Sequence, residues 1–315
     1  MIVKDILEYL DSLKIEYKYW GDRDMRIDTY CSIDNLKENA ITWVRYIEDV
    51  NAESFEEKGN VLLFAELGNE KEFSFDVIYV PHVHTVFFQV VDCFFYDKNP
   101  NNLAPKIEPS ATVLAPNIGK NIYVGHHTYI GDEVEIGNNV KIFNNVTIQG
   151  KVSIGDNCVI DSQTVIGATG FGHYDNIEGK RKTAPHLGGV VIGENVEIGS
   201  NTCIARGCLD NTVIEDGVMI DSMCFIAHNV IIRKNSMIIA GTCIGGSTTI
   251  GENTWLGINS TVSDQIIVGD NTYVGMGTLV NKAMQPGKVL VGVPARILRD
   301  NDEKTDSKIK HKKRD

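Results

Sequence analysis

The sequence lacks three features that mark common functional classes. Its 7 cysteines form no Cys-x-x-Cys pair, so a zinc site has no support from ligand spacing. Its basic residues are outnumbered, with 30 Lys and Arg against 42 Asp and Glu. The resulting net charge of -12 argues against non-specific binding to nucleic acid, which requires a basic surface. The basic run at His311–Arg314 is interpreted as a solvated tail.

Long apolar runs are also missing. The stretches Val61–Ala65 and Val86–Phe95 are too short or too polar to cross a membrane. The start, Met1–Asp5, has no basic region followed by an apolar core, so we expect no signal peptide. Scattered cysteines in odd number then favour the reducing cytoplasm. We expect a cytoplasmic protein with no transmembrane segment, no metal and no bound cofactor.

From about residue 118 an aliphatic residue returns at every sixth position. A period of six fits neither a helix nor a single strand, and it indicates a chain that turns a corner after each short strand. Three hexads then make one triangular coil of eighteen residues, with the aliphatic side chains stacked inside. The 24 positions are all Ile, Leu or Val: residues 118, 124, 130, 136, 142, 148, 154, 160 and 166, then 192, 198 and 204, then every sixth residue from 214 to 280. This pattern predicts a left-handed parallel β-helix over residues 106–284.

Two intervals interrupt the repeat. The interval Ile166–Ile192 is 26 residues long and contains Gly170–Tyr174. The interval Ile204–Ile214 is ten residues long. Segments ejected from a regular solenoid are common places for binding residues, so Phe171, His173 and His186 are candidates for substrate contact. A purely decorative insertion is the alternative.

Residues 1–105 follow a different pattern, typical of a small α/β domain. Apolar residues at Ile2, Ile6, Leu10 and Leu13 share one helical face. Strands are expected at 41–47, 61–65 and 75–80, and a helix at 83–95. Residues 285–315 form a C-terminal segment with a polar, basic tail.

Four blocks inside the repeat resemble motifs of the UDP-3-O-acylglucosamine N-acyltransferases of lipid A biosynthesis. They are Val165–Gly172, Ala205–Thr212, Phe225–Val230 and Ile239–Ser247. The resemblance implies a homotrimer that transfers a hydroxyacyl chain from acyl carrier protein to the amine of a UDP-sugar. It also implies that His228 is the general base and that the backbone amide of Gly246 stabilises the oxyanion. An aromatic residue of the small domain would stack on the base of the nucleotide, and Trp43 and Tyr46 are the candidates; core packing is the alternative role for both.

Three positions depart from the family pattern. Gln265 stands where the family has a second important histidine, and Ala205 replaces an aspartate. The ending Gly292–Arg296 resembles transferases that use coenzyme A. These departures make acyl-coenzyme A the favoured thioester donor over acyl carrier protein.

The residues also support acyl transfer by their spacing. An amine attacks a thioester only as the free base, and a histidine can accept the proton that must leave. Asp210 lies eighteen residues before His228 and Gly246 lies eighteen after it. If the register holds, the carboxylate would orient the imidazole from one side and the amide would face the oxyanion from the other. The alternative is that His228 is a corner residue with a satisfied hydrogen bond.

Three functions remain open. The favoured one is an N-acyltransferase that acts on a nucleotide-linked amino sugar with an acyl-coenzyme A donor. The second is the lipid A enzyme itself, with acyl carrier protein. The third is a non-catalytic β-helix that serves as a binding or scaffold module.

Overall fold

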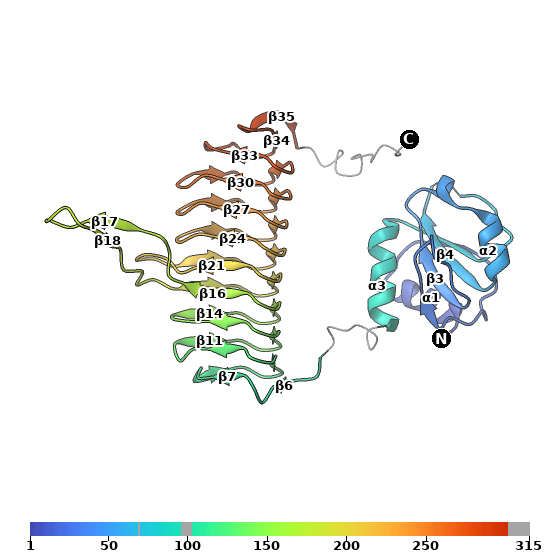
Figure 1. Cartoon of the computed structure of the whole chain (residues 1–315). Helices are drawn as coiled ribbons and strands as arrows, with labels where there is room; N and C mark the ends of the chain where they lie inside the picture. The colour runs from blue at the N-terminus through green and yellow to red at the C-terminus, as the bar shows by residue number, and fades with distance from the viewer. Residues whose placement is uncertain (69, 96–102, 302–315) are drawn as a thin grey trace. The chain divides into compact units, whose positions relative to one another are not determined.

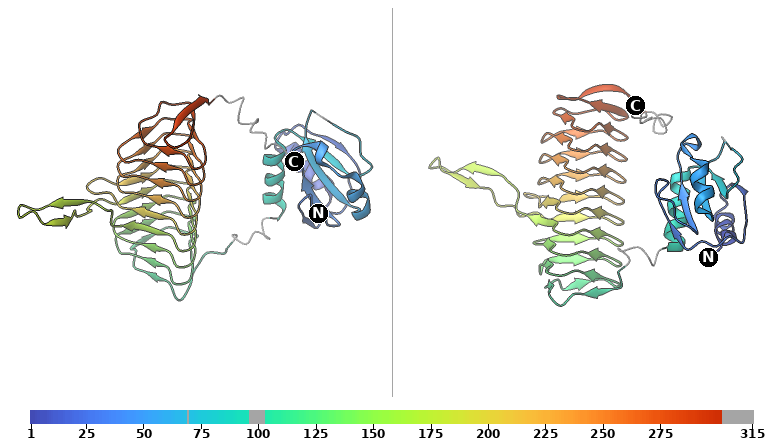
Figure 2. Two further views of the ribbon diagram at one scale, coloured as in Figure 1. Left: turned by 45° about the horizontal axis from the view of Figure 1, so that its top comes forward. Right: turned by 45° about the vertical axis from the view of Figure 1, so that its right-hand side comes forward.

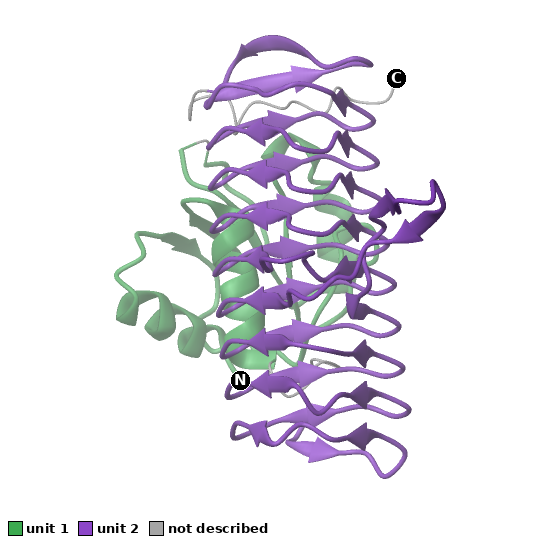
Figure 3. Ribbon diagram, turned by 90° about the vertical axis from the view of Figure 1, so that its left-hand side faces the viewer, with its two compact units in different colours: residues 1–103 green, residues 104–315 purple. Residues whose placement is uncertain are grey.

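A computed structural model describes residues 1–68, 70–95 and 103–301. The chain divides into two compact units, Met1–Leu103 and Ala104–Asp315 (Figure 3). The basic run at 311–314 lies outside the described residues. In the described ranges, none of the helices combines the length and the apolar character of a membrane span.

The first unit is a sheet with helices on both faces. In order it contains α1 (Val3–Ser12), β1 (Lys18–Trp20), β2 (Thr29–Tyr30), β3 (Ala40–Trp43), a 3₁₀ turn (Ile47–Asp49), α2 (Ala52–Lys58), β4 (Val61–Glu66), β5 (Val77–Val80) and α3 (Val83–Phe95). The strand order is β1-β5-β4-β3-β2, and all neighbours are parallel except β1 and β5. The strands expected at 41–47 and 75–80 are therefore shorter than predicted, and β1, β2 and α2 were not predicted.

Both faces of this sheet are buried. Leu62 and Phe64 pack with α1 and α3, whereas Val61 and Leu63 pack on the opposite face with Phe55 of α2. This explains why β4 reads as a continuous apolar run.

The second unit is the predicted parallel β-helix, with three faces of stacked short strands (Figure 1). The first face contains β7 (Thr112–Val113), β10 (Tyr129–Ile130), β13 (Thr147–Ile148), β16 (Val165–Ala168), β21 (Cys203–Ala205), β24 (Phe225–Ile226), β27 (Cys243–Ile244), β30 (Thr261–Val262) and β33 (Leu279–Val280). The second contains β8 (Asn117–Ile118), β11 (Val134–Ile136), β14 (Val152–Ile154), β19 (Val190–Ile192), β22 (Thr212–Ile214), β25 (Ile231–Ile232), β28 (Thr249–Ile250) and β31 (Ile267–Val268). The third contains β6 (Lys106–Ile107), β9 (Tyr123–Val124), β12 (Lys141–Ile142), β15 (Val159–Ile160), β20 (Glu197–Ile198), β23 (Met219–Ile220), β26 (Met237–Ile238), β29 (Trp255–Leu256), β32 (Tyr273–Val274), β34 (Lys288–Val291) and β35 (Arg296–Asp300).

The aliphatic ladder predicted from the sequence forms the core. Except for the half-buried Ile118, each of the 24 positions is buried. In the regular coils each residue pairs with the one eighteen positions later, as Ile130 does with Ile148 and Ile148 with Ile166. Small polar residues also point inward, and their hydroxyls donate to backbone carbonyls, as Ser236 Oγ does to Gly251 O at 2.7 Å. The ladder thus buries apolar surface while most of these hydroxyls are paired; Thr278 Oγ1 is buried without a hydrogen-bond partner among the described residues.

Both interruptions of the repeat leave the β-helix at one corner, the turn from the first face to the second, which we call the first corner. Ile166 pairs with Ile204, an offset of 38 residues instead of eighteen. The additional residues include an antiparallel hairpin of β17 (His173–Asp175) and β18 (Arg181–Thr183) that projects from the β-helix (Figures 1 and 2). Ile204 pairs with Ile226 at an offset of 22, so four residues are added there. The prediction of ejected segments is confirmed.

Candidate active site

A cavity of about 560 Å³ lies along the first corner and the adjoining edge of the first face. It extends over five successive coils, from the turn after β16 to the turn after β30. Its walls are largely apolar or backbone, and they combine residues of the strands with residues of the turns: Ala168, Thr169, Gly170, Phe171, Cys203, Ala205, Phe225, Ala227, His228, Gly245, Gly246, Ser247, Asp264 and Gln265. The motifs that resemble the acyltransferase family therefore meet in one place.

His228 lies two residues after the end of β24 and lines this cavity. Its ring lies against Gly246, one coil away: a Cβ atom on Gly246 would stand 2.7 Å from Cε1 and 2.9 Å from Nε2 of the imidazole. Only a residue without a side chain leaves this space, so Gly246 determines where the ring can lie. The predicted proximity of His228 and Gly246 is observed.

Asn229 orients the imidazole. Its Oδ1 lies 3.1 Å from His228 Nδ1 and also accepts a hydrogen bond from Cys208 N at 3.0 Å. Its Nδ2 donates to Asp210 O at 3.1 Å, which fixes the amide so that Oδ1 faces the ring. Since Oδ1 is an acceptor, Nδ1 of the neutral imidazole carries the hydrogen. Nε2 is then the atom with the free lone pair, as a general base requires.

The carboxylate of Asp210 does not take the position predicted for it. Its side chain is exposed, and no hydrogen bond or ion pair joins it to His228 among the described residues. The reason is the four-residue insertion, because β24 pairs with β21 at an offset of 22 residues while β25 pairs with β22 at eighteen. Asp210 contributes its backbone carbonyl, which holds Asn229, and Asn229 contacts the imidazole.

The backbone amide of Gly246 is available as a donor. Gly245 N donates to Val262 O and Ser247 N donates to His228 O, both within the β-helix. Gly246 N has no hydrogen-bond partner in the described ranges. An unpaired N–H beside the imidazole suits the stabilisation of an oxyanion.

The remaining candidates of the β-helix differ in position. Phe171 and Gln265 line the cavity, and Phe171 is strongly exposed. His173 lies in β17 and does not line the cavity. Its ring packs edge to face on that of Phe171, with ring centroids 4.2 Å apart. His186 is 7% exposed and its ring centroid lies 5.3 Å from that of His228. Its ring packs against Gly170, where an added Cβ atom would stand 2.5 Å from Nε2 of His186. His186 is not part of the lining, so its contact with substrate stays a prediction.

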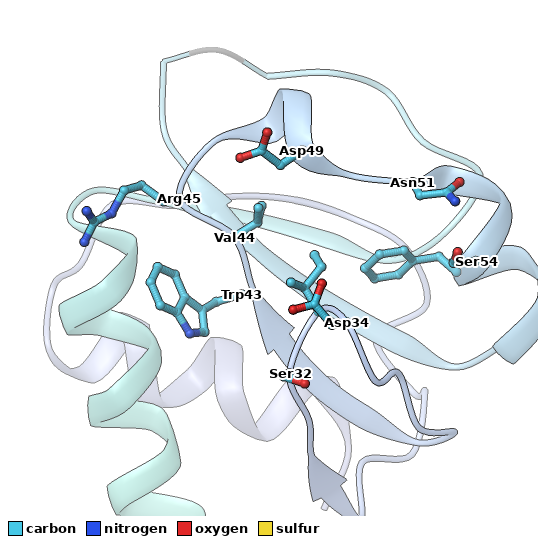
Figure 4. A pocket seen from close by; sticks show the side chains of 10 residues that line it. Ser32, Asp34, Trp43, Val44, Arg45, Asp49, Asn51 and Ser54 are labelled. Carbon is cyan, nitrogen blue, oxygen red and sulfur yellow. The ribbon is translucent and has the colours of Figure 1, made fainter. Parts of the chain in front are cut away.

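The first unit contains a separate cavity of about 620 Å³, shown in Figure 4. Trp43 at the end of β3 lines it together with Asp34, Arg45 and Asp49. Open α/β sheets commonly bind ligands at the carboxyl ends of parallel strands, and Trp43 is in such a position. The indole is half-buried and packs edge to face on His84, with ring centroids 5.1 Å apart. Tyr46 is 46% exposed and does not line this cavity.

One cysteine, Cys203, lines the cavity. Burial raises the pKa of Cys203, which favours its neutral form over a thiolate. In the parts of the chain that the structure describes, no group of three or more His, Cys, Asp or Glu side chains could hold a metal ion.

Comparison with known proteins gives three kinds of similarity. The bacterial transferase hexapeptide family model (six repeats) matches residues 133–168 and 247–282. A UDP-3-O-acylglucosamine N-acyltransferase from Saccharophagus degradans is 62% identical over 74 residues, which are 24% of this chain and 21% of that protein. UDP-3-O-acylglucosamine N-acyltransferase 2 from Legionella pneumophila is 55% identical over 80 residues, 25% of this chain and 23% of that protein. The matches thus span less than a quarter of the length of these curated relatives.

Among solved structures, a UDP-N-acetylglucosamine acyltransferase from Campylobacter jejuni superimposes with a TM-score of 0.56 at 24% identity. The match covers 62% of this chain and 75% of that one, and it shows a shared fold. The fold class and the resemblance to the UDP-3-O-acylglucosamine N-acyltransferases are confirmed, and the relatives so named are N-acyltransferases.

Sequence reasoning missed two residues of the site. Asn229 was part of the recognised block, and its contact with His228 depends on the turn conformation, with a φ of 59° that asparagine tolerates. Asp264 is eighteen residues after Gly246 and thirty-six after His228, so the period of the coil could have identified it.

Proposed function

We propose that this chain is an N-acyltransferase that moves an acyl group from a thioester to the amino group of a nucleotide-linked amino sugar. The observation that carries the proposal is the imidazole of His228, which lines the cavity and is held by Asn229 with no hydrogen-bond partner at Nε2 among the described residues. The base would remove the proton that the attacking amine must lose. The amide of Gly246 would stabilise the oxyanion of the tetrahedral intermediate.

Among amino-sugar acceptors, the names of the curated relatives favour UDP-3-O-acylglucosamine. The resemblance described in the sequence analysis implies acyl carrier protein as the donor. Both curated relatives carry the name of that acyltransferase, at 62% and 55% identity over their matched segments. The reaction is therefore our first choice, ahead of the coenzyme A reaction that the sequence departures favour.

A coenzyme A donor is the second candidate. The turn between β34 and β35 contains Gly292 and Pro294, which belong to the ending that resembles coenzyme A transferases.

A donor and acceptor panel tests both candidates. The protein is incubated with acyl carrier proteins and acyl-coenzymes A of several chain lengths, each with UDP-3-O-acylglucosamine or other UDP-amino sugars. Mass spectrometry of the sugar nucleotide should detect an N-acyl product that disappears in His228→Ala. Absence of any product across the panel would leave the third reading, a non-catalytic scaffold.

We further propose a homotrimer. The cavity is open along the outside of one β-helix, and a neighbouring copy would supply the wall that excludes water. Light scattering should give three times the chain mass of 34.9 kDa.

All seven cysteines are unpaired, which fits a reducing cytoplasm as the place of the reaction.

A further inference from the structure

Asp264 occupies the same position of the first corner as His228 and Gly246. The strands that precede the three residues pair in register, Ile226 with Ile244 and Ile244 with Val262. Neighbouring strands are separated by about 4.8 Å, so two coils place the Asp264 backbone about 10 Å from that of His228. Gly246 lies between them without a side chain, and the ring of His228 lies across it. The imidazole and the carboxylate therefore border the same space above Gly246.

Asp264 is the one side chain with a full charge in the lining of this cavity. The other described residues of the lining are apolar, glycine, neutral polar, or His228, and none is Lys or Arg. No ion pair of Asp264 exists within the described ranges. Asp264 is an exposed residue of this lining, and a carboxylate there without a protein cation can form a charge-assisted hydrogen bond with a cationic group of a ligand.

The orientation of the carboxylate is fixed on one side. Gln265 Nε2 donates to Asp264 Oδ2 at 2.9 Å. Oδ1 has no hydrogen-bond partner in the described part of the chain. Gln265, which stands at the position of the family's second histidine, thus acts on the site through Asp264.

We propose that Asp264 binds the ammonium group of the acceptor and selects an amine over a hydroxyl at the reacting position. This inference rests on the proposed function. The ammonium donates one N–H to Asp264 Oδ1, and Nε2 of His228 takes a proton from the same nitrogen. The free amine then attacks the thioester carbon, so that a C–N bond forms and the C–S bond breaks. The leaving sulfur takes a proton from the imidazolium, and the net reaction releases one further proton to solvent. A hydroxyl at the same carbon carries no charge for Asp264 to bind.

Binding measurements without any donor test the inference. The probes are UDP-glucosamine and UDP-glucose, which differ by an amine against a hydroxyl at one carbon. Isothermal titration near neutral pH should show that the wild-type protein prefers UDP-glucosamine by about 10- to 30-fold, as one charge-assisted hydrogen bond provides. Asp264→Asn should lose this preference through weaker binding of UDP-glucosamine, while the affinity for UDP-glucose stays unchanged.

A matched control is Asp132→Asn. Asp132 follows Ile130 as Asp264 follows Val262, at the same corner position, and it is exposed outside the cavity. This variant should keep the wild-type preference. An Asp264→Asn protein that still prefers the amine to the wild-type extent would overturn the inference, and so would a wild-type protein that binds both sugars equally. Since no acyl donor is present, a failure of acyl transfer in the panel above would count against the proposed function alone.

Discussion

Gly246→Ala is the sharpest test of how the site places its base. The new Cβ atom would stand 2.7 Å from Cε1 and 2.9 Å from Nε2 of His228. Ordinary carbon contacts begin near 3.4 Å, so the ring must move by about 0.7 Å. A displacement of about 1 Å at a catalytic group can cost about 100-fold, and we expect kcat to fall by about that factor, or about 2.7 kcal/mol in activation free energy.

Stability should change little in the same variant. The obstructing atoms belong to the far end of a side chain that can turn away, and the backbone at Gly246 has no positive φ that alanine would strain. Gly131→Ala is the control, because its Cβ atom would meet nothing closer than 3.5 Å at the same corner of an earlier coil. We expect unchanged kcat and unchanged melting temperature for this control.

A double variant separates the ring from the oxyanion. If Gly246→Ala acts by moving the imidazole, it should have little further effect in a His228→Ala background. If it acts by obstructing the oxyanion at Gly246 N, the loss should be similar in both backgrounds. The assay is single-turnover acyl transfer with the donor and acceptor found in the panel, with calorimetry for stability. A Gly246→Ala enzyme within about threefold of wild-type kcat would refute the reasoning about ring position.

Three other predictions follow from the structure. His228→Ala should lower kcat by about 10²–10⁴-fold with an unchanged melting temperature, as expected for a general base outside the aliphatic ladder; near wild-type turnover would place the base elsewhere. Trp43→Ala and Tyr46→Ala should raise KM for the sugar nucleotide and leave KM for the acyl donor nearly unchanged. If KM for the sugar nucleotide is the same in wild type and both variants, the two residues serve packing alone. Burial raises the pKa of Cys158 and Cys224 to about 11, so both remain neutral thiols at mildly alkaline pH. In the native protein, iodoacetamide should therefore label the exposed Cys93 and leave Cys158 and Cys224 unmodified. Peptide mass spectrometry of the treated protein checks this outcome.

The β-helix could be predicted because its signal repeats. Each hexad contributes the same inward aliphatic residue, and a single misassigned residue changes nothing in the register of the rest. The short strands of the first unit have no such redundancy. Strand β1 is three residues long, Lys18–Trp20, and among the described strands it pairs with β5 alone, far along the chain. Its pairing partner, and not a local pattern, makes it a strand.

The site was predictable as far as the period of the coil holds. Counting by eighteen from His228 reaches Gly246 correctly, because no insertion lies between β24 and β27. Counting back to Asp210 crosses a turn where four residues are added, and the sequence does not show on which side of Asp210 they fall. The structure has an offset of 22 before this turn and of eighteen after it. Asn229 therefore contacts the imidazole where the spacing suggested Asp210.

The position of the site at one corner follows from how a β-helix is stabilised. Residues of the faces are constrained twice, since the inward side chains stack in the core and the backbone pairs with the coils above and below. Shortening an inward residue such as Ile226 or Ile244 would leave a cavity and cost about 2–5 kcal/mol. At the corner the backbone still pairs, as Ser247 N does with His228 O. His228, Gly246 and Asp264 lie outside the core cluster, so these positions can be chosen for chemistry. Both insertions and all three of these residues lie at the first corner. A change of side chain there can alter which acceptor substrate the site binds without disturbing the aliphatic ladder that holds the coils together.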